Sequence, residues 1–208
     1  MTSTQPFPPS LVQAIDLAVR KLEEGGVIIY PTETFYGLGA AVSNSAALKR
    51  LAGIKGREGN KPMPVIVPDV ETALRLWSKV PEVARLLMHR FWPGPLTIVL
   101  PARPGLPFEV AHTGEVGLRV SSHPVAQQLA RRIGPIAASS ANLAGSRERT
   151  RVAELDRALL EAVDAVVDAG QTPGGPASTV LRLTDGKPQI LREGTIQRAL
   201  IEACFVGS

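Results

Sequence analysis

Short apolar runs alternate with amphipathic helical stretches from one end of this chain to the other, and that alternation constrains the fold more than any other feature. Apolar spacing predicts helices over 10–24, 44–51, 70–77, 81–91, 124–133, 152–163 and 196–203. Strands are expected at 27–30, 63–67, 96–100, 116–120, 136–138, 165–167, 178–183 and 189–191. This interleaving is typical of an α/β protein in which helices pack on a sheet.

Three local signals refine the α/β prediction. Ser10 followed by Gln13 is a capping-box pattern, so the first helix should open at Ser10. Pro64 cannot donate to a strand ladder, which predicts an edge or a bulge for 63–67. Asp185-Gly186 between two β-rich runs indicates a hairpin, so the sheet should be mixed. Because there is no repeat and no long linker, we expect residues 1–208 to form a single domain.

The composition excludes several classes of protein. Hydrophobic residues make up 44% and charged residues 20% of the 208 positions, which excludes a disordered chain. The single cysteine, Cys204, excludes an internal disulfide and a multi-cysteine metal site. The sequence has no secretory leader and no apolar run near the length of a membrane helix, which predicts a soluble cytoplasmic protein. A net charge of +4 allows an anionic ligand without demanding one.

The common nucleotide-binding and hydrolase motifs are absent from the sequence. There is no G-x-x-x-x-G-K-[ST] and no G-x-S-x-G, and the dinucleotide pattern that begins at 37–39 fails at Val42. His89, His112 and His123 are far apart and pair with no cysteine at ligand spacing. Structural or surface roles are therefore expected for the histidines.

Four polar segments stand at the ends of expected elements, where α/β sheets bind ligands: 31–39, 55–57, 139–145, and 178–180 together with 190–194. Glycines in the first let backbone approach a ligand closely, and the two cations of the second can converge on one anion. The small hydroxyl and amide groups of the third form a nest-like surface for phosphate. Taken singly, each signal is poor: the first segment alone would be an ordinary turn, and the second and third have ordinary explanations as a solvated helix end and as a turn with a helix cap.

Seven separated segments together closely resemble one family, the threonylcarbamoyl-adenylate synthases with the YrdC-like fold. In family order they are GGVIIYPTETFYGLGA, KGR, FWPGPLTIVL, VGLRVSSHP, SSANLAG, ASTVL and ILREG. The resemblance covers roughly 11–194, nearly the whole chain. It implies a twisted mixed β-sheet with helices packed on it, a concave basic ligand cleft and a core at about 11–195.

The resemblance also implies an activity. Such enzymes are nucleotidyltransferases that make threonylcarbamoyl-AMP and diphosphate from L-threonine, bicarbonate and ATP, with Mg²⁺ accompanying the ATP and no metal ligand from protein side chains. The product feeds threonylcarbamoyl-adenosine formation in tRNA through a downstream threonylcarbamoyl-transferase complex. Weak tRNA or RNA binding is a further interaction that the resemblance allows, and no membrane is involved.

The resemblance assigns two groups of ligand contacts. Those to ATP fall on Lys55, Arg57, Ser140, Asn142 and Arg192, of which the first four match the family's catalytic KxR…SxN set. Those to threonine fall on Thr32, Arg119 and Ser178.

Two positions depart from the family pattern. Ala144 replaces the second serine that is frequent in SANxSG, and 62–67 has no histidine where many members have one. The chain should correspond to the short form of the family, without the extra C-terminal domain of longer relatives.

Two alternatives stay open on the sequence. One is an RNA-binding module of the same fold, with the basic stretch 49–61 lining a concave face, although no aromatic residue interleaves that stretch. The other is a protein of the same fold with a lost active site and a tRNA- or ribosome-linked role. The intact KxR…SxN set argues against the second alternative.

Overall fold

The computed structural model describes residues 7–56, 62–143 and 145–205, and its strands form one nine-stranded sheet in the order β7-β1-β2-β6-β3-β5-β4-β8-β9. In chain order the strands are β1 (Ile28–Pro31), β2 (Tyr36–Ala41), β3 (Val65–Ile66), β4 (Leu96–Pro101), β5 (Glu115–Arg119), β6 (Ile136–Ser140), β7 (Ala165–Val166), β8 (Thr179–Thr184) and β9 (Lys187–Arg192). The pairs β1/β7, β3/β5 and β4/β8 are parallel and the other neighbours antiparallel, which confirms the predicted mixed sheet.

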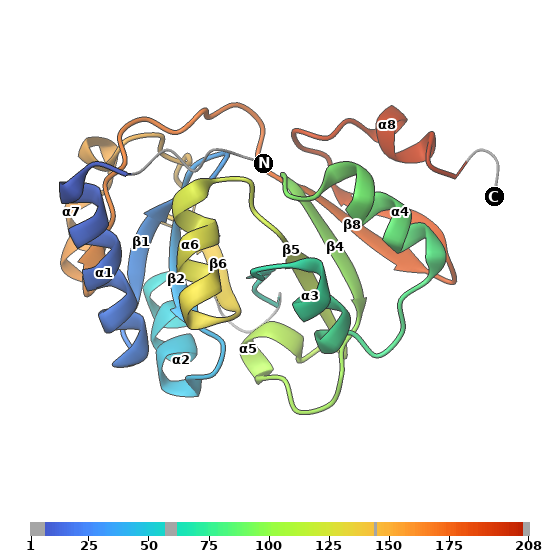
Figure 1. Ribbon diagram of the computed structural model, residues 1–208, viewed down its shortest axis with the longest axis horizontal. Coiled ribbons are helices and arrows are strands. Elements are labelled where there is room, and N and C mark those ends of the chain that lie inside the picture. Colours follow the sequence, from blue (N-terminus) through green and yellow to red (C-terminus); the bar gives the residue numbers. More distant parts are fainter. Residues whose placement is uncertain (1–6, 57–61, 144, 206–208) are drawn as a thin grey trace.

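Helices cover both faces of this sheet (Figure 1). They are α1 (Pro9–Glu23), α2 (Ser45–Ile54), α3 (Val70–Leu76), α4 (Glu82–Phe91), α5 (Phe108–Ala111), α6 (Pro124–Ile133), α7 (Arg157–Glu161) and α8 (Arg198–Glu202). Helices α1 and α6 lie side by side over β1 and bury Ile28, whereas the next residue, Ile29, belongs to the larger cluster that contains α2. Alternate residues of a strand point to opposite faces, so β1 is covered on both sides.

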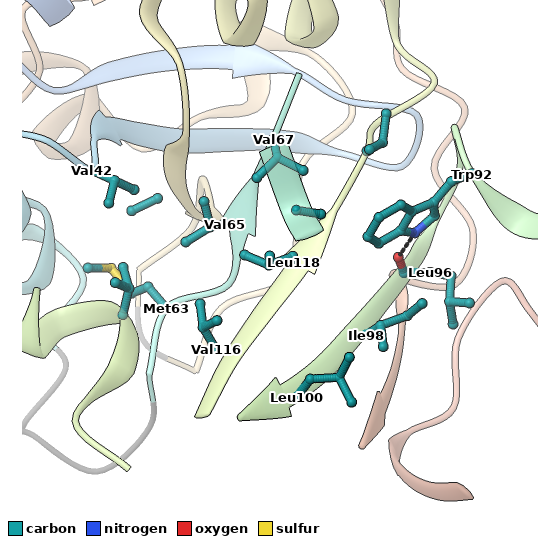
Figure 2. Close-up of a cluster of buried hydrophobic side chains, with 14 of the residues drawn as sticks. Val42, Met63, Val65, Val67, Trp92, Leu96, Ile98, Leu100, Val116 and Leu118 are labelled. Carbon is teal, nitrogen blue, oxygen red and sulfur yellow. Dashed lines mark hydrogen bonds between the residues drawn. The ribbon is translucent and has the colours of Figure 1, made fainter. Parts of the chain in front are cut away.

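The larger apolar cluster fills the space beside the central strands (Figure 2). Val65, Leu118 and Ile98 lie in register on β3, β5 and β4, and all three are buried. Trp92 packs into the same cluster, and its indole Nε1 donates to the backbone oxygen of Leu96 at 2.7 Å. Because a buried N–H without a partner costs about 1–3 kcal/mol, this bond allows a large ring to fill the core.

Two predicted helix boundaries are wrong. Helix α1 begins at Pro9, with Pro8 as N-cap and no side-chain cap bond, so Ser10 lies inside the helix. Proline suits the first helical position because its missing N–H would have no helical partner there. The helix predicted over 152–163 is a 3₁₀ turn at Val152–Glu154 followed by the short α7. Asp156 divides them, because its side chain accepts from the N–H of Ala158 and starts a new helix.

Strand β3 is central, so the prediction that Pro64 would place it at an edge or a bulge is wrong. Its two residues, Val65 and Ile66, lie between β6 and β5. Pro64 stands just before them, and its carbonyl accepts from the N–H of Ala138 at 2.8 Å. A proline is excluded only where the ladder needs its N–H, and at this position the ladder uses its oxygen.

None of the helices in the described ranges is long and apolar enough to cross a bilayer.

His123 caps helix α6 and should make stability depend on pH. Its Nδ1 accepts from the N–H of Val125 at 3.2 Å, and burial lowers the pKa of the ring, an effect that nearby Glu33 opposes. The unfolded chain therefore takes up this proton more readily than the folded one. We expect the free energy of unfolding to fall as the pH drops through the unfolded value of about 6.5.

The matched variant for this test is His123→Asn, which keeps a capping acceptor but has no titratable ring. The free energy of unfolding, measured with denaturant, should fall less between about pH 7.5 and about pH 5.5 for the variant than for the unmodified protein. His89→Asn, at an exposed position, is the comparison variant. An equal acid-induced loss with and without His123 would contradict the assignment.

Candidate functional site

Five of the sequence-predicted site residues line one pocket: Thr32, Arg119, Ser140, Ser178 and Arg192. Four of them stand at or just beyond the carboxyl ends of β1, β5, β6 and β9, and the fifth precedes β8. The sheet therefore gathers side chains that are up to 160 positions apart in the sequence. Pro64 also lines the pocket, within the segment where many family members have a histidine.

Lys55 and Asn142 are not among the residues that line this pocket, but Lys55 contacts Ser140, which does. Lys55 caps the end of α2, is 8% exposed, and directs Nζ at the Ser140 backbone oxygen and Oγ at 3.0 and 3.2 Å. The same Nζ donates to the backbone oxygen and Oδ1 of Asn142 at 2.6 and 2.5 Å. Three of the four KxR…SxN residues are thus in direct contact. The fourth, Arg57, lies outside the described residues, as does Ala144.

Ser178 and Arg192 are adjacent across the β8–β9 hairpin. The guanidinium of Arg192 donates through Nε and Nη2 to the backbone oxygen of Ser178 at 3.1 and 2.9 Å, and through Nη2 to Ser178 Oγ at 3.0 Å. The residues assigned to the threonine side and to the nucleotide side therefore meet at one point of the wall. Their individual ligand contacts remain predictions.

Arg119 is held by a carboxylate to which the sequence analysis gave no role. Its Nη1 lies 3.0 Å from Oε1 of Glu33, and each of these side chains is only 10% exposed. Ser121 Oγ donates to the other carboxylate oxygen of Glu33. Glu33 is therefore a positioning residue that fixes and partly neutralises the Arg119 guanidinium. The only signal in the sequence was a carboxylate between two threonines after a buried strand.

The hydroxyl of Thr32 closes the tight turn between β1 and β2. Its Oγ1 donates to the backbone oxygen of Phe35 at 2.7 Å and accepts from the N–H groups of Thr34 and Phe35, both at 3.3 Å. Local side-chain-to-backbone bonds of this kind are what make threonine a turn residue. The contact of Thr32 with substrate threonine remains a prediction.

The first polar segment contains a strand that the sequence analysis missed. Residues Tyr36–Ala41 form β2, which pairs antiparallel with both β1 and β6. At Gly39 an added Cβ would lie 2.6 Å from Cε1 of Tyr30 and 2.9 Å from Cγ2 of Ile136. This glycine makes room for the Tyr30 ring and not for a ligand, so its predicted role is wrong. Gly37 does border the pocket.

Charges of both signs lie in the described pocket wall. Arg119 and Arg192 contribute guanidinium groups and Glu148 a carboxylate. The predicted basic character of the cleft therefore remains a prediction. Within the described ranges, no group of three or more His, Cys, Asp or Glu side chains is placed to hold a metal ion.

These features define an α/β small-molecule-binding protein, with guanidinium and hydroxyl donors gathered at strand ends, an ammonium group in contact with one of them, and a pocket suited to an anionic ligand. Residues 20–194 match the model of the Sua5/YciO/YrdC family, described as telomere recombination, and the chain belongs to this family.

Similar proteins carry a consistent name. A threonylcarbamoyl-AMP synthase of Bacillus subtilis is 40% identical over 198 residues, which are 94% of this chain and 56% of that protein. A putative threonylcarbamoyl-AMP synthase of Methanocaldococcus jannaschii is 31% identical over 92% of this chain and 91% of its own length. The crystal structure of P. abyssi Sua5 complexed with L-threonine has a TM-score of 0.85 and 35% identity, covering 93% of this chain and 57% of that one.

The likeness to Sua5 confirms the predicted YrdC-like fold, a mixed sheet with helices packed on it. The chain spans a little more than half the length of the Bacillus subtilis and P. abyssi proteins.

Proposed function

We propose that the chain is an L-threonylcarbamoyladenylate synthase, which makes threonylcarbamoyl-AMP and diphosphate from L-threonine, bicarbonate and ATP. The observation that carries the proposal is the convergence on one pocket of five residues from five separate sequence segments. The names of the relatives and the threonine bound to P. abyssi Sua5 support the same function. The product then passes to a threonylcarbamoyl-transferase complex that modifies tRNA.

The reaction depends on positioning and charge neutralisation. The amine of threonine and bicarbonate combine to a carbamate with loss of water. A carbamate oxygen then forms a bond to the α-phosphorus of ATP while the bond from that phosphorus to the departing diphosphate breaks. Because the nucleophile is already anionic, no serine or cysteine nucleophile is needed, and catalysis comes from orientation and from donors placed where charge develops.

The residues divide this work between the two substrates. Lys55 supplies positive charge beside the strand-end loop, and Ser140 and Asn142 supply polar contacts for the phosphates. Arg192 serves the nucleotide from the opposite hairpin. Arg119 pairs with the carboxylate of threonine. Its guanidinium, already oriented by Glu33, then contacts two carboxylates.

The metal enters with the nucleotide. Mg²⁺ prefers oxygen ligands and is usually bound through substrate phosphates and waters, with few protein side chains. Ser140 and Asn142 place neutral oxygens next to the pocket, which fits an ion carried on the triphosphate. When bound, Mg²⁺ neutralises phosphate charge.

The alternative function, an RNA-binding module, has less support than the synthase. Within the basic stretch 49–61, Arg50 forms an ion pair with Asp164 at 2.5 Å and Lys55 is buried against Ser140. The described members of the stretch therefore do not share one open basic face of the kind that backbone phosphates bind.

The proposal is tested by co-substrate dependence. Purified protein with Mg-ATP, threonine and bicarbonate should release diphosphate, and omission of either threonine or bicarbonate should abolish most of the release. The reason is that the nucleophile exists only after both have combined. A coupled assay for diphosphate measures the rate. ATP hydrolysis independent of threonine would contradict the proposal, and so would tight, salt-dependent RNA binding without ATP turnover.

A further inference from the structure

Tyr30 carries a buried hydroxyl that no protein group satisfies in the described part of the chain. The residue is 0% exposed, yet it lines the pocket. Among the described residues its Oη has no hydrogen-bond partner. The only other pocket-lining hydroxyl in this state within those ranges is that of Ser139, which lies next to Ala138 on β6 and so points to the opposite face from it.

The sequence builds a trough that directs the Tyr30 ring toward the pocket. The Tyr30 ring extends from β1 over β2 at Gly39, which has no side chain to block it. Gly37, on the same strand, also has no side chain beside the ring. On the next strand, β6, Ala138 stands opposite Gly39 and belongs to the same apolar cluster as Tyr30. Gly37, Ala138 and Tyr30 all border the pocket. The two glycines of β2 and Ala138 of β6 thus leave the space that the aromatic ring occupies.

A phenylalanine in this trough would avoid the unpaired hydroxyl, since a buried polar group without a partner is destabilising. The hydroxyl of Tyr36, by contrast, has a structural role, because protein groups satisfy its hydrogen bonds. Its Oη lies 2.7 Å from the backbone oxygen of Gly170 and 3.1 Å from Asp168 Oδ1, which share its single proton, and it accepts from the N–H of Ala169. The difference indicates that the partner of the Tyr30 hydroxyl comes from outside the fold.

The missing partner is an acceptor. Burial raises the pKa of Tyr30 well above its ordinary value, more than the Arg119 charge lowers it, so the phenol stays protonated at neutral pH and donates. The nearby Arg119 guanidinium favours an acceptor that is also an anion, although the Glu33 carboxylate, which acts on Tyr30 as well, offsets part of that charge.

We propose that Tyr30 is a substrate-binding residue whose hydroxyl donates a hydrogen bond to a carboxylate-type oxygen held beside Arg119. This inference rests on the proposed function. Two of its substrates carry such an oxygen, namely the carboxylate of threonine and bicarbonate, whereas the nucleotide does not.

The test is Tyr30→Phe with steady-state kinetics for each substrate in turn. The KM for threonine or for bicarbonate should rise about tenfold or more, while the KM for ATP stays within about twofold, since a hydrogen bond to a charged group is lost from one oxyanion only. Whichever KM rises identifies the source of the oxygen. The proposal is overturned if both oxyanion KM values stay unchanged or if only the ATP value moves. Ser78→Ala, which removes a hydroxyl outside the pocket lining, is the activity control.

A binding measurement separates this proposal from the proposed function. Thermal unfolding of the unmodified protein should shift upward with L-threonine or with bicarbonate, and the shift should shrink in Tyr30→Phe. If the unmodified protein releases no diphosphate, the proposed function fails, while this measurement still decides on Tyr30. Equal ligand-induced shifts in both proteins would overturn the inference.

Tyr36→Phe is the matched control for stability. It loses the contacts of the hydroxyl with Asp168, Gly170 and Ala169 and should melt at a lower temperature without ligand, whereas Tyr30→Phe should melt no lower than the unmodified protein. If the melting temperature without ligand falls as much in Tyr30→Phe as in Tyr36→Phe, the Tyr30 hydroxyl has a protein partner and the inference fails.

Discussion

Replacing Lys55 with methionine is expected to lower kcat/KM for diphosphate release by roughly tenfold to a hundredfold, because a charge-assisted contact is worth about 1.5–3 kcal/mol. The substitution keeps an apolar stem and removes only the ammonium. Because Nζ also joins the oxygens of Ser140 and Asn142, the variant should unfold at a lower temperature as well. Kinetics at saturating co-substrates, with circular dichroism and a melting curve, measure both effects.

The matched control is Lys49→Met, an exposed lysine on the same helix, α2. It should retain normal kcat/KM and melting temperature. Near-normal turnover by Lys55→Met would remove Lys55 from the phosphate site. A comparable loss is expected for Arg57→Ala, on the strength of the sequence pattern alone.

Glu33→Ala is expected to destabilise the protein by about 3–5 kcal/mol, the usual cost of leaving one partner of a buried ion pair unpaired. The partner is Arg119, and both side chains are 10% exposed. The double variant with Arg119→Met should recover most of the loss, because no buried charge is then left alone. Denaturant unfolding gives the free energies for the single and double variants.

An exposed pair provides the comparison for Glu33. Asp16 and Arg132 lie 2.6 Å apart with side chains 40% and 39% exposed, and Asp16→Ala should cost less than about 1 kcal/mol. If Glu33→Ala costs no more than Asp16→Ala, or if the double variant is as unstable as the single one, the ion pair does not hold Arg119 in place.

Elements with one strong local signal could be predicted from the sequence. Helix α6 begins and ends as its proline and apolar spacing indicate, and the turn at Asp185 and Gly186 forms with both residues at positive φ. Strand β2 could not be predicted, because Y-G-L-G-A has the composition of a turn. It becomes a strand only through its neighbours β1 and β6, and strand propensity depends strongly on such context.

The same limit applies to the site. The contact of Lys55 with Ser140 and Asn142 agrees with a sequence pattern that groups them. The roles of Glu33 and Tyr30 depend on which strands become neighbours: Glu33 meets Arg119 of β5, and the Tyr30 ring lies over Gly39 of β2. Residue spacing along the chain does not encode these distances.

The two-residue strand β3 also bears on how the chain folds during synthesis. On one side of it the sheet consists of β1 and β2 with β6 and β7; on the other side, of β4 and β5 with β8 and β9. Each half thus joins an early stretch of chain to a late one, and such non-local pairing slows folding. During synthesis, β2 has no partner on one side until β6 has been made, and β4 has none on one side until β8 has been made. Before those partners exist, the unpaired edges of β2 and β4 can pair with strands of other chains, which makes the incomplete polypeptide prone to aggregation.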